Sequence, residues 1–325
     1  MKRALLAAAF ISIIGLVSVS AQRVYVAGQD NGNAVYWIDG VRNTLSAKGY
    51  TSEAVGTTVS GSNIYIAGNE YYEDFDVEYC LPVYWLNGRR VELPIGDFDS
   101  ATINAIASSG SDVIAAGYVE YWDWDDADYD EFYAVYWRNG TLTELDVRSD
   151  DSSAWDILIS SSNVYIAGRD GSNAVYWLNG RRTELPKTKN SAKARGITVS
   201  GQNVYVVGQD GNEAVYWLNG VRYALPSASG KEAAADRIIV SGSNIYITGF
   251  DDDVPVYWLN GRMTALPKAS SDYKAWASGI AVSGSNVYIA GNDNEAVFWL
   301  NGRRTALPKI GVSGRSSAYH ILVVR

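Results

Sequence analysis

Carboxylates and aromatic rings, the side chains of this chain best suited to binding or chemistry, gather in two short segments. Residues 69–81 (NEYYEDFDVEYCL) hold five acidic and four aromatic residues, and residues 118–133 (YVEYWDWDDADYDEFY) hold seven of each, with no basic residue in either segment. The whole chain has 36 acidic against 27 basic residues. The negative charge is therefore concentrated in these segments, whose carboxylates must stay hydrated, bind cations or meet a basic partner, because burying them unpaired is costly.

We expect the two segments to form one acidic, aromatic-rich ridge that binds a protein or a glycan. The candidate contact residues are Glu70, Tyr71, Tyr72, Asp74, Phe75, Asp76, Tyr121, Trp122, Asp123, Trp124, Asp125, Asp126, Tyr129 and Asp130. Two other interpretations stay open. The segments could be solvated loops that keep the protein soluble, or Asp126, Asp128 and Asp130 could hold calcium, although the Gly and Glu of an EF-hand loop are missing.

Catalytic chemistry has little support in the sequence. His320 is the single histidine, which excludes a multi-histidine metal site and allows one histidine base at most. No serine or cysteine nucleophile motif occurs, and the remaining candidates are Asp156 and Asp236, as a carboxylate pair for glycoside hydrolysis. We therefore expect a protein that is not an enzyme and needs no cofactor. Nucleic acid is disfavoured as a partner because phosphate contacts require a basic surface.

A sequence repeat predicts the fold that positions these residues. The unit VYWLNG, or a near copy, occurs seven times, with its tryptophan at Trp37, Trp85, Trp137, Trp177, Trp217, Trp258 and Trp299, at spacings of 48, 52, 40, 40, 41 and 41 residues. The two ends of the chain together complete one more unit, which a ring explains and a linear solenoid does not. We predict an all-β, seven-bladed β-propeller of four-stranded antiparallel blades, with N-terminal and C-terminal strands paired in one blade.

The last full unit shows the pattern of one blade. Residues 279–283, 287–291, 296–300 and 303–307 are predicted strands, and Asn301-Gly302 predicts a two-residue hairpin turn. The segment GIAVS…NVYIAG resembles the blades of NHL-type propellers, and Trp-x-Asn-Gly-x-x-x-x-Leu resembles HAF-type repeats of bacterial extracellular proteins. The resemblance spans residues 22–325 and implies the propeller fold and an exported bacterial protein. It implies no catalytic residue, since it rests on framework positions.

The N-terminus carries the signs of export. Lys2 and Arg3 precede an apolar run, and Val19-Ser20-Ala21 fits a secretory cleavage site, so we predict a signal peptide over residues 1–21 and one propeller domain over 22–325, with insertions at 69–81 and 118–133. We expect no transmembrane segment after cleavage and a monomer that is periplasmic, surface-exposed or extracellular. Cys80 is the single cysteine, so no internal disulfide can form.

A second asymmetry lies where each innermost strand is predicted to start. Five residues before the serine of GIAVS and its counterparts stand Val55, Asn104, Trp155, Arg195, Asp236, Ser278 and Tyr319, and next come Gly56, Ala105, Asp156, Gly196, Arg237, Gly279 and His320. In a propeller this rim surrounds the central channel. The candidates for a polar pocket there are Asn104, Trp155, Asp156, Arg195, Asp236, Arg237, Tyr319 and His320. The alternative is that these residues are unconstrained connectors.

Together these features favour an exported, non-catalytic binding or scaffold propeller that presents its acidic face to a protein or glycan. One alternative is a multivalent lectin that stacks sugars on the repeated tryptophans and binds them with the repeated arginines. Because identical residues in all seven blades are more often packing between blades, we expect the tryptophans to be core. A glycoside-acting enzyme and a purely structural envelope protein are the remaining alternatives.

Overall fold

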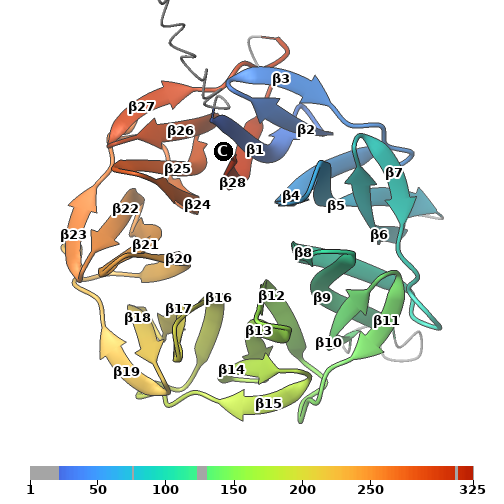
Figure 1. Cartoon of the computed structure of the whole chain (residues 1–325), viewed down its shortest axis with the longest axis horizontal. Coiled ribbons are helices and arrows are strands. Elements are labelled where there is room, and N and C mark those ends of the chain that lie inside the picture. Colours follow the sequence, from blue (N-terminus) through green and yellow to red (C-terminus); the bar gives the residue numbers. More distant parts are fainter. Residues whose placement is uncertain (1–21, 75–76, 123–129, 312–313, 325) are drawn as a thin grey trace, which may run out of the picture.

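The computed structural model describes residues 22–74, 77–122, 130–311 and 314–324. In these residues, 28 strands form seven four-stranded antiparallel sheets arranged in a ring (Figure 1). The predicted seven-bladed propeller is confirmed. The predicted signal peptide lies outside the described residues and stays a prediction. The described part of the chain forms no helix with the length and hydrophobicity that crossing a membrane would require.

Each blade runs from the central channel outward through four strands. The innermost strands of blades 1 to 7 are β28 (Ser316–Val324), β4 (Thr51–Ser60), β8 (Ser100–Ser109), β12 (Ser152–Ser160), β16 (Ala192–Ser200), β20 (Ala233–Ser241) and β24 (Ala275–Ser283). The second strands are β1 (Arg23–Asp30), β5 (Asn63–Asp74), β9 (Asp112–Trp122), β13 (Asn163–Asp170), β17 (Asn203–Asp210), β21 (Asn244–Asp251) and β25 (Asn286–Asp293). The third strands are β2 (Asn33–Ile38), β6 (Val77–Leu86), β10 (Asp130–Arg138), β14 (Asn173–Leu178), β18 (Glu213–Leu218), β22 (Val254–Leu259) and β26 (Ala296–Leu300). The outermost strands are β3 (Val41–Thr44), β7 (Arg89–Glu92), β11 (Thr141–Glu144), β15 (Arg181–Glu184), β19 (Val221–Ala224), β23 (Arg262–Ala265) and β27 (Arg303–Ala306).

Blade 1 closes the ring with strands from both ends of the chain. The last strand, β28, pairs antiparallel with β1, with Val26 opposite Ile321, and Figure 1 shows the two strands side by side. Pairing both edges of β1 removes two free strand edges at the point where the chain begins and ends. The predicted closure is therefore confirmed.

The predicted Asn-Gly turns join the third and fourth strands of the blades. In blade 2, Asn87 has a φ of 51° and Gly88 a φ of 83°, the left-handed pair that a type I′ turn requires. The Asn87 side chain also accepts a hydrogen bond from the backbone N–H of Ile64 at 2.9 Å. The turn residue therefore joins the hairpin to the neighbouring strand of the same blade.

The seven repeated tryptophans tie each blade to the one before it. Each is at most 1% exposed, and each indole N–H donates to the carbonyl just after the outermost strand of the preceding blade. The pairs are Trp37 with Pro308, Trp85 with Ser46, Trp137 with Pro94, Trp177 with Asp146, Trp217 with Pro186, Trp258 with Pro226 and Trp299 with Pro267, at 2.6 to 2.9 Å. The expectation that these rings are core is confirmed.

A buried ion pair repeats near the end of the second strand of most blades. In blade 4, Asp170 accepts hydrogen bonds from the backbone N–H groups of Arg148 and Ser149 and forms an ion pair with Arg182 at 2.5 Å. Both side chains of this pair are at most 4% exposed. The matching pairs are Asp30–Arg42, Glu70–Arg90, Asp210–Arg222 and Asp293–Arg304. The second arginine of the RRTELP motif is thus a framework residue.

Two blades replace this ion pair. In blade 3 the same positions are Val119 and Leu142, which pack in one apolar cluster. In blade 6, Met263 occupies the position of the arginine. Asp251 instead accepts hydrogen bonds from the Ser227 hydroxyl and the Ala228 backbone N–H, at 2.7 Å each. A buried carboxylate at this position therefore has either an arginine or hydroxyl groups as its partner, because a buried charge needs a partner.

The adjacent arginines of blade 4 allow a matched test of this role. Arg182→Met should lower the free energy of unfolding by about 3 kcal/mol, because it leaves Asp170 buried without its cation. Arg181 is exposed on the same strand, and Arg181→Met should change stability by less than about 0.5 kcal/mol. Urea denaturation of the two variants measures both effects, and equal losses would contradict the framework role of Arg182.

Candidate functional site

The seven varied rim residues are β-bulges inside the innermost strands. In blade 5, Ala194 pairs with Gly208 and Gly196 pairs with Val207, which leaves Arg195 as the extra residue. The same register shift occurs at Val55, Asn104, Trp155, Asp236, Ser278 and Tyr319. The prediction that these strands begin one residue after each bulge residue was wrong. The strands start four or five residues earlier and continue through the bulge, which directs one side chain of each blade toward the channel.

A glycine in the second strand makes room for each bulge. A Cβ atom on Gly68 would lie 2.0 Å from the carbonyl oxygen of Glu53 and 2.8 Å from the ring of Trp85. The glycines at the same place in the other six blades would meet a strand carbonyl at 1.8 to 2.1 Å. The bulged backbone therefore passes directly over glycine, with the buried tryptophan close by in most blades. The repeated glycine of the VYIAG segments is the sequence signal for this feature.

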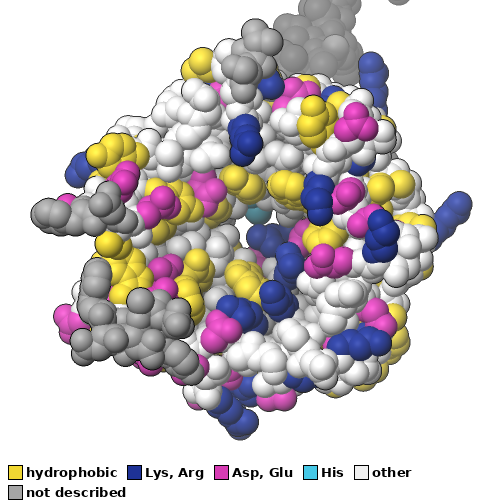
Figure 2. All heavy atoms as spheres, turned by 180° about the vertical axis from the view of Figure 1, so that it is seen from behind, with side chains coloured by type: hydrophobic (Ala, Val, Ile, Leu, Met, Phe, Trp, Pro, Cys, Tyr) yellow, Lys and Arg dark blue, Asp and Glu magenta, His cyan; other side chains and the backbone are white. Residues whose placement is uncertain are grey.

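All seven bulge residues line one pocket at the mouth of the central channel. The pocket has a volume of about 470 Å³ and is also lined by Glu53, Lys193, Arg237 and Trp276. It opens on the face that carries the connections between blades, and Figure 2 shows basic side chains gathered beside the central opening. A second hollow of about 380 Å³ shares Arg195, Asp236 and Trp276 with it. We call the first pocket the channel mouth.

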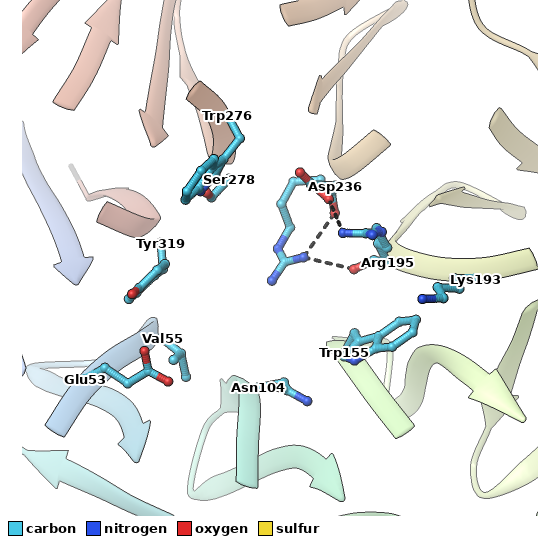
Figure 3. A pocket seen from close by; sticks show the side chains of 11 residues that line it. Glu53, Val55, Asn104, Trp155, Lys193, Arg195, Asp236, Trp276, Ser278 and Tyr319 are labelled. Atoms are coloured by element: carbon cyan, nitrogen blue, oxygen red, sulfur yellow. Dashed lines mark hydrogen bonds and ion pairs between the residues drawn. The ribbon is translucent and has the colours of Figure 1, made fainter. Parts of the chain in front are cut away.

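Charges are distributed unevenly around the channel mouth (Figure 3). On one side, Arg195 Nη1 lies 3.1 Å from Asp236 Oδ1. Arg237 Nη1 donates to the carbonyl oxygens of Arg195 and Asp236, at 2.9 and 3.0 Å. Lys193 lies beside Arg195 and Trp155, while Glu53 and Tyr319 lie on the opposite side. The mouth therefore presents three cations and Asp236 on one side and Glu53 on the other.

Glu53 is held in place by its neighbours in blade 2. Its Oε1 atom accepts hydrogen bonds from the Tyr71 hydroxyl at 2.8 Å and from the Asn69 amide at 3.2 Å. Burial and the charge of Glu53 raise the pKa of Tyr71, and the same two causes raise the pKa of Tyr319. Both phenols therefore stay neutral donors at ordinary pH. One acidic segment thus reaches the channel mouth indirectly, through Tyr71.

Large side chains and glycines alternate in the layer just below the bulges. Asp156, Arg237 and His320 come from blades 4, 6 and 1, whereas blades 5, 7 and 2 have glycine at this position. A Cβ on Gly196 would lie 2.6 Å from the Asp236 carbonyl of the next blade. Each large residue therefore lies next to at least one glycine, and the other neighbour of Asp156 is the small Ala105 of blade 3. Asp156 Oδ2 accepts the backbone N–H of Ile197 at 2.9 Å, and His320 Nδ1 lies 3.0 Å from the Thr57 hydroxyl.

Burial controls the charge of this layer. It lowers the pKa of His320 to about 3, with a further lowering by the positive charge of Arg237, so the imidazole is neutral at ordinary pH. Burial raises the pKa of Asp156, against the opposing effects of Arg237 and of backbone N–H groups. It also raises the pKa of Asp236, against the charges of Arg195 and Arg237. Below this layer the channel is lined mainly by isoleucine, leucine and valine and has a volume of about 360 Å³.

The two acidic segments are extended hairpins rather than loops. β5 and β6 pair as far as Asp74 and Val77, and β9 and β10 pair as far as Trp122 and Asp130. The hairpins stand on neighbouring blades 2 and 3 (Figure 1). Glu70 was predicted to contact a partner on the acidic ridge, and this was wrong, because Glu70 is fully buried and bound to Arg90. Register explains this, because Glu70 occupies the framework position of Asp30 and Asp170.

The remaining candidates of the acidic segments divide into three groups. Asp74, Tyr121 and Asp130 are exposed. Tyr72 is half-buried, stacks on Tyr79 with ring centroids 5.3 Å apart and donates to Glu70, and Trp122 is half-buried near Glu120. Outside the described residues lie Phe75, Asp76, Asp123, Trp124, Asp125, Asp126, Asp128 and Tyr129, and with them most of the calcium candidate. Within the described ranges, no group of three or more His, Cys, Asp or Glu side chains is placed to hold a metal.

The lectin alternative was wrong about the repeated tryptophans and about the second arginine of the repeat. The repeated tryptophans expose no ring face on which a sugar could stack. The second arginine of the repeat binds a buried carboxylate in five blades. Sequence reasoning also missed Glu53, Lys193 and Trp276 at the channel mouth. They stand two residues before a bulge, a position that also varies from blade to blade and could have been found by the same alignment.

Comparisons with known proteins support the fold. No protein-family model matches the sequence, and no curated protein does. The computationally designed protein Ika8 has a TM-score of 0.50 and 14% identity, over 91% of this chain and 92% of that one. The acylaminoacyl peptidase of Pyrococcus horikoshii has a TM-score of 0.52 and 13% identity, over 89% of this chain and 51% of that one, so this chain spans about half its length. Apo AztD from Citrobacter koseri has a TM-score of 0.45 and 11% identity, over 93% and 98%. The likenesses to Ika8 and to the peptidase show the fold alone, and the resemblance to NHL-type and HAF-type repeats stays a prediction.

Two glycines of blade 2 test how the bulge is built. Gly68→Ala should lower the free energy of unfolding by about 2 kcal/mol or more, because its Cβ would overlap the bulged backbone at Glu53. Gly56→Ala should change stability by less than about 1 kcal/mol, since its nearest neighbour is a side-chain methyl of Ile106 at 3.4 Å. Denaturant unfolding of both variants compares them, and a tolerated Gly68→Ala would show that the bulge needs no glycine.

Proposed function

We propose that this protein is an exported, non-catalytic binding propeller whose ligand occupies the channel mouth. One observation carries the proposal: the framework residues repeat around the ring, whereas the seven bulge residues all differ and line one pocket. Packing alone gives no reason for seven different side chains on seven similar bulges. A pocket of about 470 Å³ lies within the usual size of small-ligand sites. Export rests on the predicted signal peptide.

The proposal of a non-enzyme is supported by the state of the acidic groups at the site. Asp236 is in an ion pair with Arg195, and Asp156 accepts a backbone N–H and lies 4.0 Å from Arg237. Glycoside hydrolysis needs two carboxylates that face one bond from either side, one of them free to deliver a proton. His320 is neutral at ordinary pH and is bound to Thr57. These groups therefore hold the channel wall together.

The acidic hairpins are a second candidate surface, for a protein or a glycan. Glu73, Asp74 and Asp130 are exposed near the ends of two neighbouring hairpins, and Tyr121 is 47% exposed beside them. Carboxylates interleaved with aromatic rings fit a basic protein surface or the hydroxyls and faces of a sugar chain. This candidate rests on the charge and the aromatic content of the two segments.

Binding to a glycan array can separate the two surfaces. Trp155→Ala removes an aromatic ring from the channel mouth and should weaken binding about tenfold or more. Trp122→Ala is the matched change on a hairpin and should leave binding unchanged. Replacing residues 72–79 and 120–132 by Asn-Gly should also leave it unchanged, since it closes each hairpin with a two-residue turn and keeps Glu70 and Tyr71, which holds Glu53 at the mouth. Binding that survives Trp155→Ala and is lost with the hairpins would move the site to the second candidate.

A further inference from the structure

Lys193 is a half-buried cation whose side chain lacks a partner among the residues that the structure describes. It stands on β16, two residues before the bulge at Arg195, and Figure 3 shows its side chain at the channel mouth beside Trp155. Within the described part of the chain, its ammonium group makes no hydrogen bond or ion pair. The nearby acids are engaged elsewhere, since Asp151 forms an ion pair with Arg169 and Glu232 accepts a hydrogen bond from Gln209 at 3.0 Å.

The surroundings of Lys193 disfavour its positive charge, which a bound anion would stabilise. Burial lowers the pKa of Lys193, and the positive charges of Arg195 and Arg169 lower it further. Arg237 binds two backbone carbonyls through Nη1, and its Nη2 has no acceptor among the described residues. Of the two carboxylates that line the mouth, Asp236 is already paired with Arg195. Arg237 Nε also lies 4.0 Å from Asp156 Oδ1. Lys193 is therefore the cation left for a ligand, and Arg237 adds its Nη2 as a further donor.

An aromatic ring stands next to these donors. Trp155 lines the mouth and lies beside Lys193 in Figure 3, with the Arg169 guanidinium 5.9 Å from its ring centroid. On the other side of the mouth, Glu53 could accept hydrogen bonds from ligand hydroxyl groups. A negatively charged group attached to a flat, hydroxylated ring would satisfy both sides. A compact oxyanion suits the cationic side, because hydrogen bonds between charged groups are the strong ones.

We propose that the channel mouth binds a small ligand through an oxyanion, a carboxylate or a phosphate ester, held by Lys193 and Arg237 with the ring of the ligand beside Trp155. This inference rests on the proposed function and adds the chemical class of the ligand to it. It concerns residues that the acidic hairpins do not contain. The chain as a whole is negatively charged. Anions are therefore attracted by the local positive charge of the mouth and not by the net charge of the protein.

Three probes with the same ring test the proposal: D-galactose, D-galacturonate and D-galactose 6-phosphate. They differ at one carbon, so a preference for the two anions reports the oxyanion, and the stronger of the two identifies carboxylate or phosphate. Binding is followed by calorimetry and by NMR of protein labelled at the lysine Cε. We expect the two anions to bind at millimolar concentration, galactose to bind more weakly, and the pKa of Lys193 to rise when an anion is bound, because a nearby negative charge favours the ammonium form.

Variants separate the site from general electrostatics. Lys193→Met should weaken binding of the anions about tenfold or more, and Lys193→Arg should restore most of it. Lys48→Met is the control, because Lys48 is an exposed lysine of a blade connection away from the mouth. The Lys193 ammonium group makes no hydrogen bond within the described residues, so replacement of the side chain should leave thermal unfolding unchanged.

Two outcomes would overturn the inference: anions that bind no better than galactose, or equal binding by Lys193→Met and the unmodified protein. Either result leaves the proposed function standing if a neutral glycan still binds and is lost with Trp155→Ala. The proposed function fails instead if no variant of the mouth changes any binding.

Discussion

The hydrogen bond from each repeated tryptophan to the carbonyl of the preceding blade is the interaction on which the ring depends. It joins neighbouring blades where their sheets contribute no shared strand, and it recurs at all seven junctions, including the one from Trp37 to Pro308 that joins the two ends of the chain. A buried indole N–H without an acceptor would cost free energy, so each ring fixes the position of one connection. The carboxylates that bind the same connections, such as Asp170, act with it.

Because the tryptophans join the blades, the innermost strands can differ in sequence from blade to blade. The tryptophans join the blades at the third strands and the connections, away from the channel. At the channel, each strand bulges over a glycine and directs one side chain into the opening. Some of these side chains also contact the next blade, since Arg195 pairs with Asp236 and Asn104 donates to the Ala154 carbonyl. Nearly equal blades can therefore support seven unequal residues. The layer below follows a similar rule, because Asp156, Arg237 and His320 lie next to glycines.

The sequence predicted the parts that follow from spacing and missed those that follow from register. The count of tryptophans predicted seven blades, and the two incomplete end units predicted their closure in one blade. The bulges were missed because a residue added to a strand breaks the alternation by which strands are recognised. Glu70 was assigned to the acidic surface from its neighbours, although its place two residues after Gly68 matches Asp170 after Gly168. The alignment could have marked the position of Lys193 as variable, but only the structure shows that its ammonium group lacks a partner.

The central claim is that the bulge residues carry binding while the framework carries the fold. Its most direct test is a variant with serine at six bulge positions, the seventh being Ser278 already, compared with the unmodified protein by thermal unfolding and ligand binding. The account predicts a melting temperature within about 5 °C of the original and loss of binding. A variant that unfolds, or one that still binds the ligand with its original affinity, would contradict it.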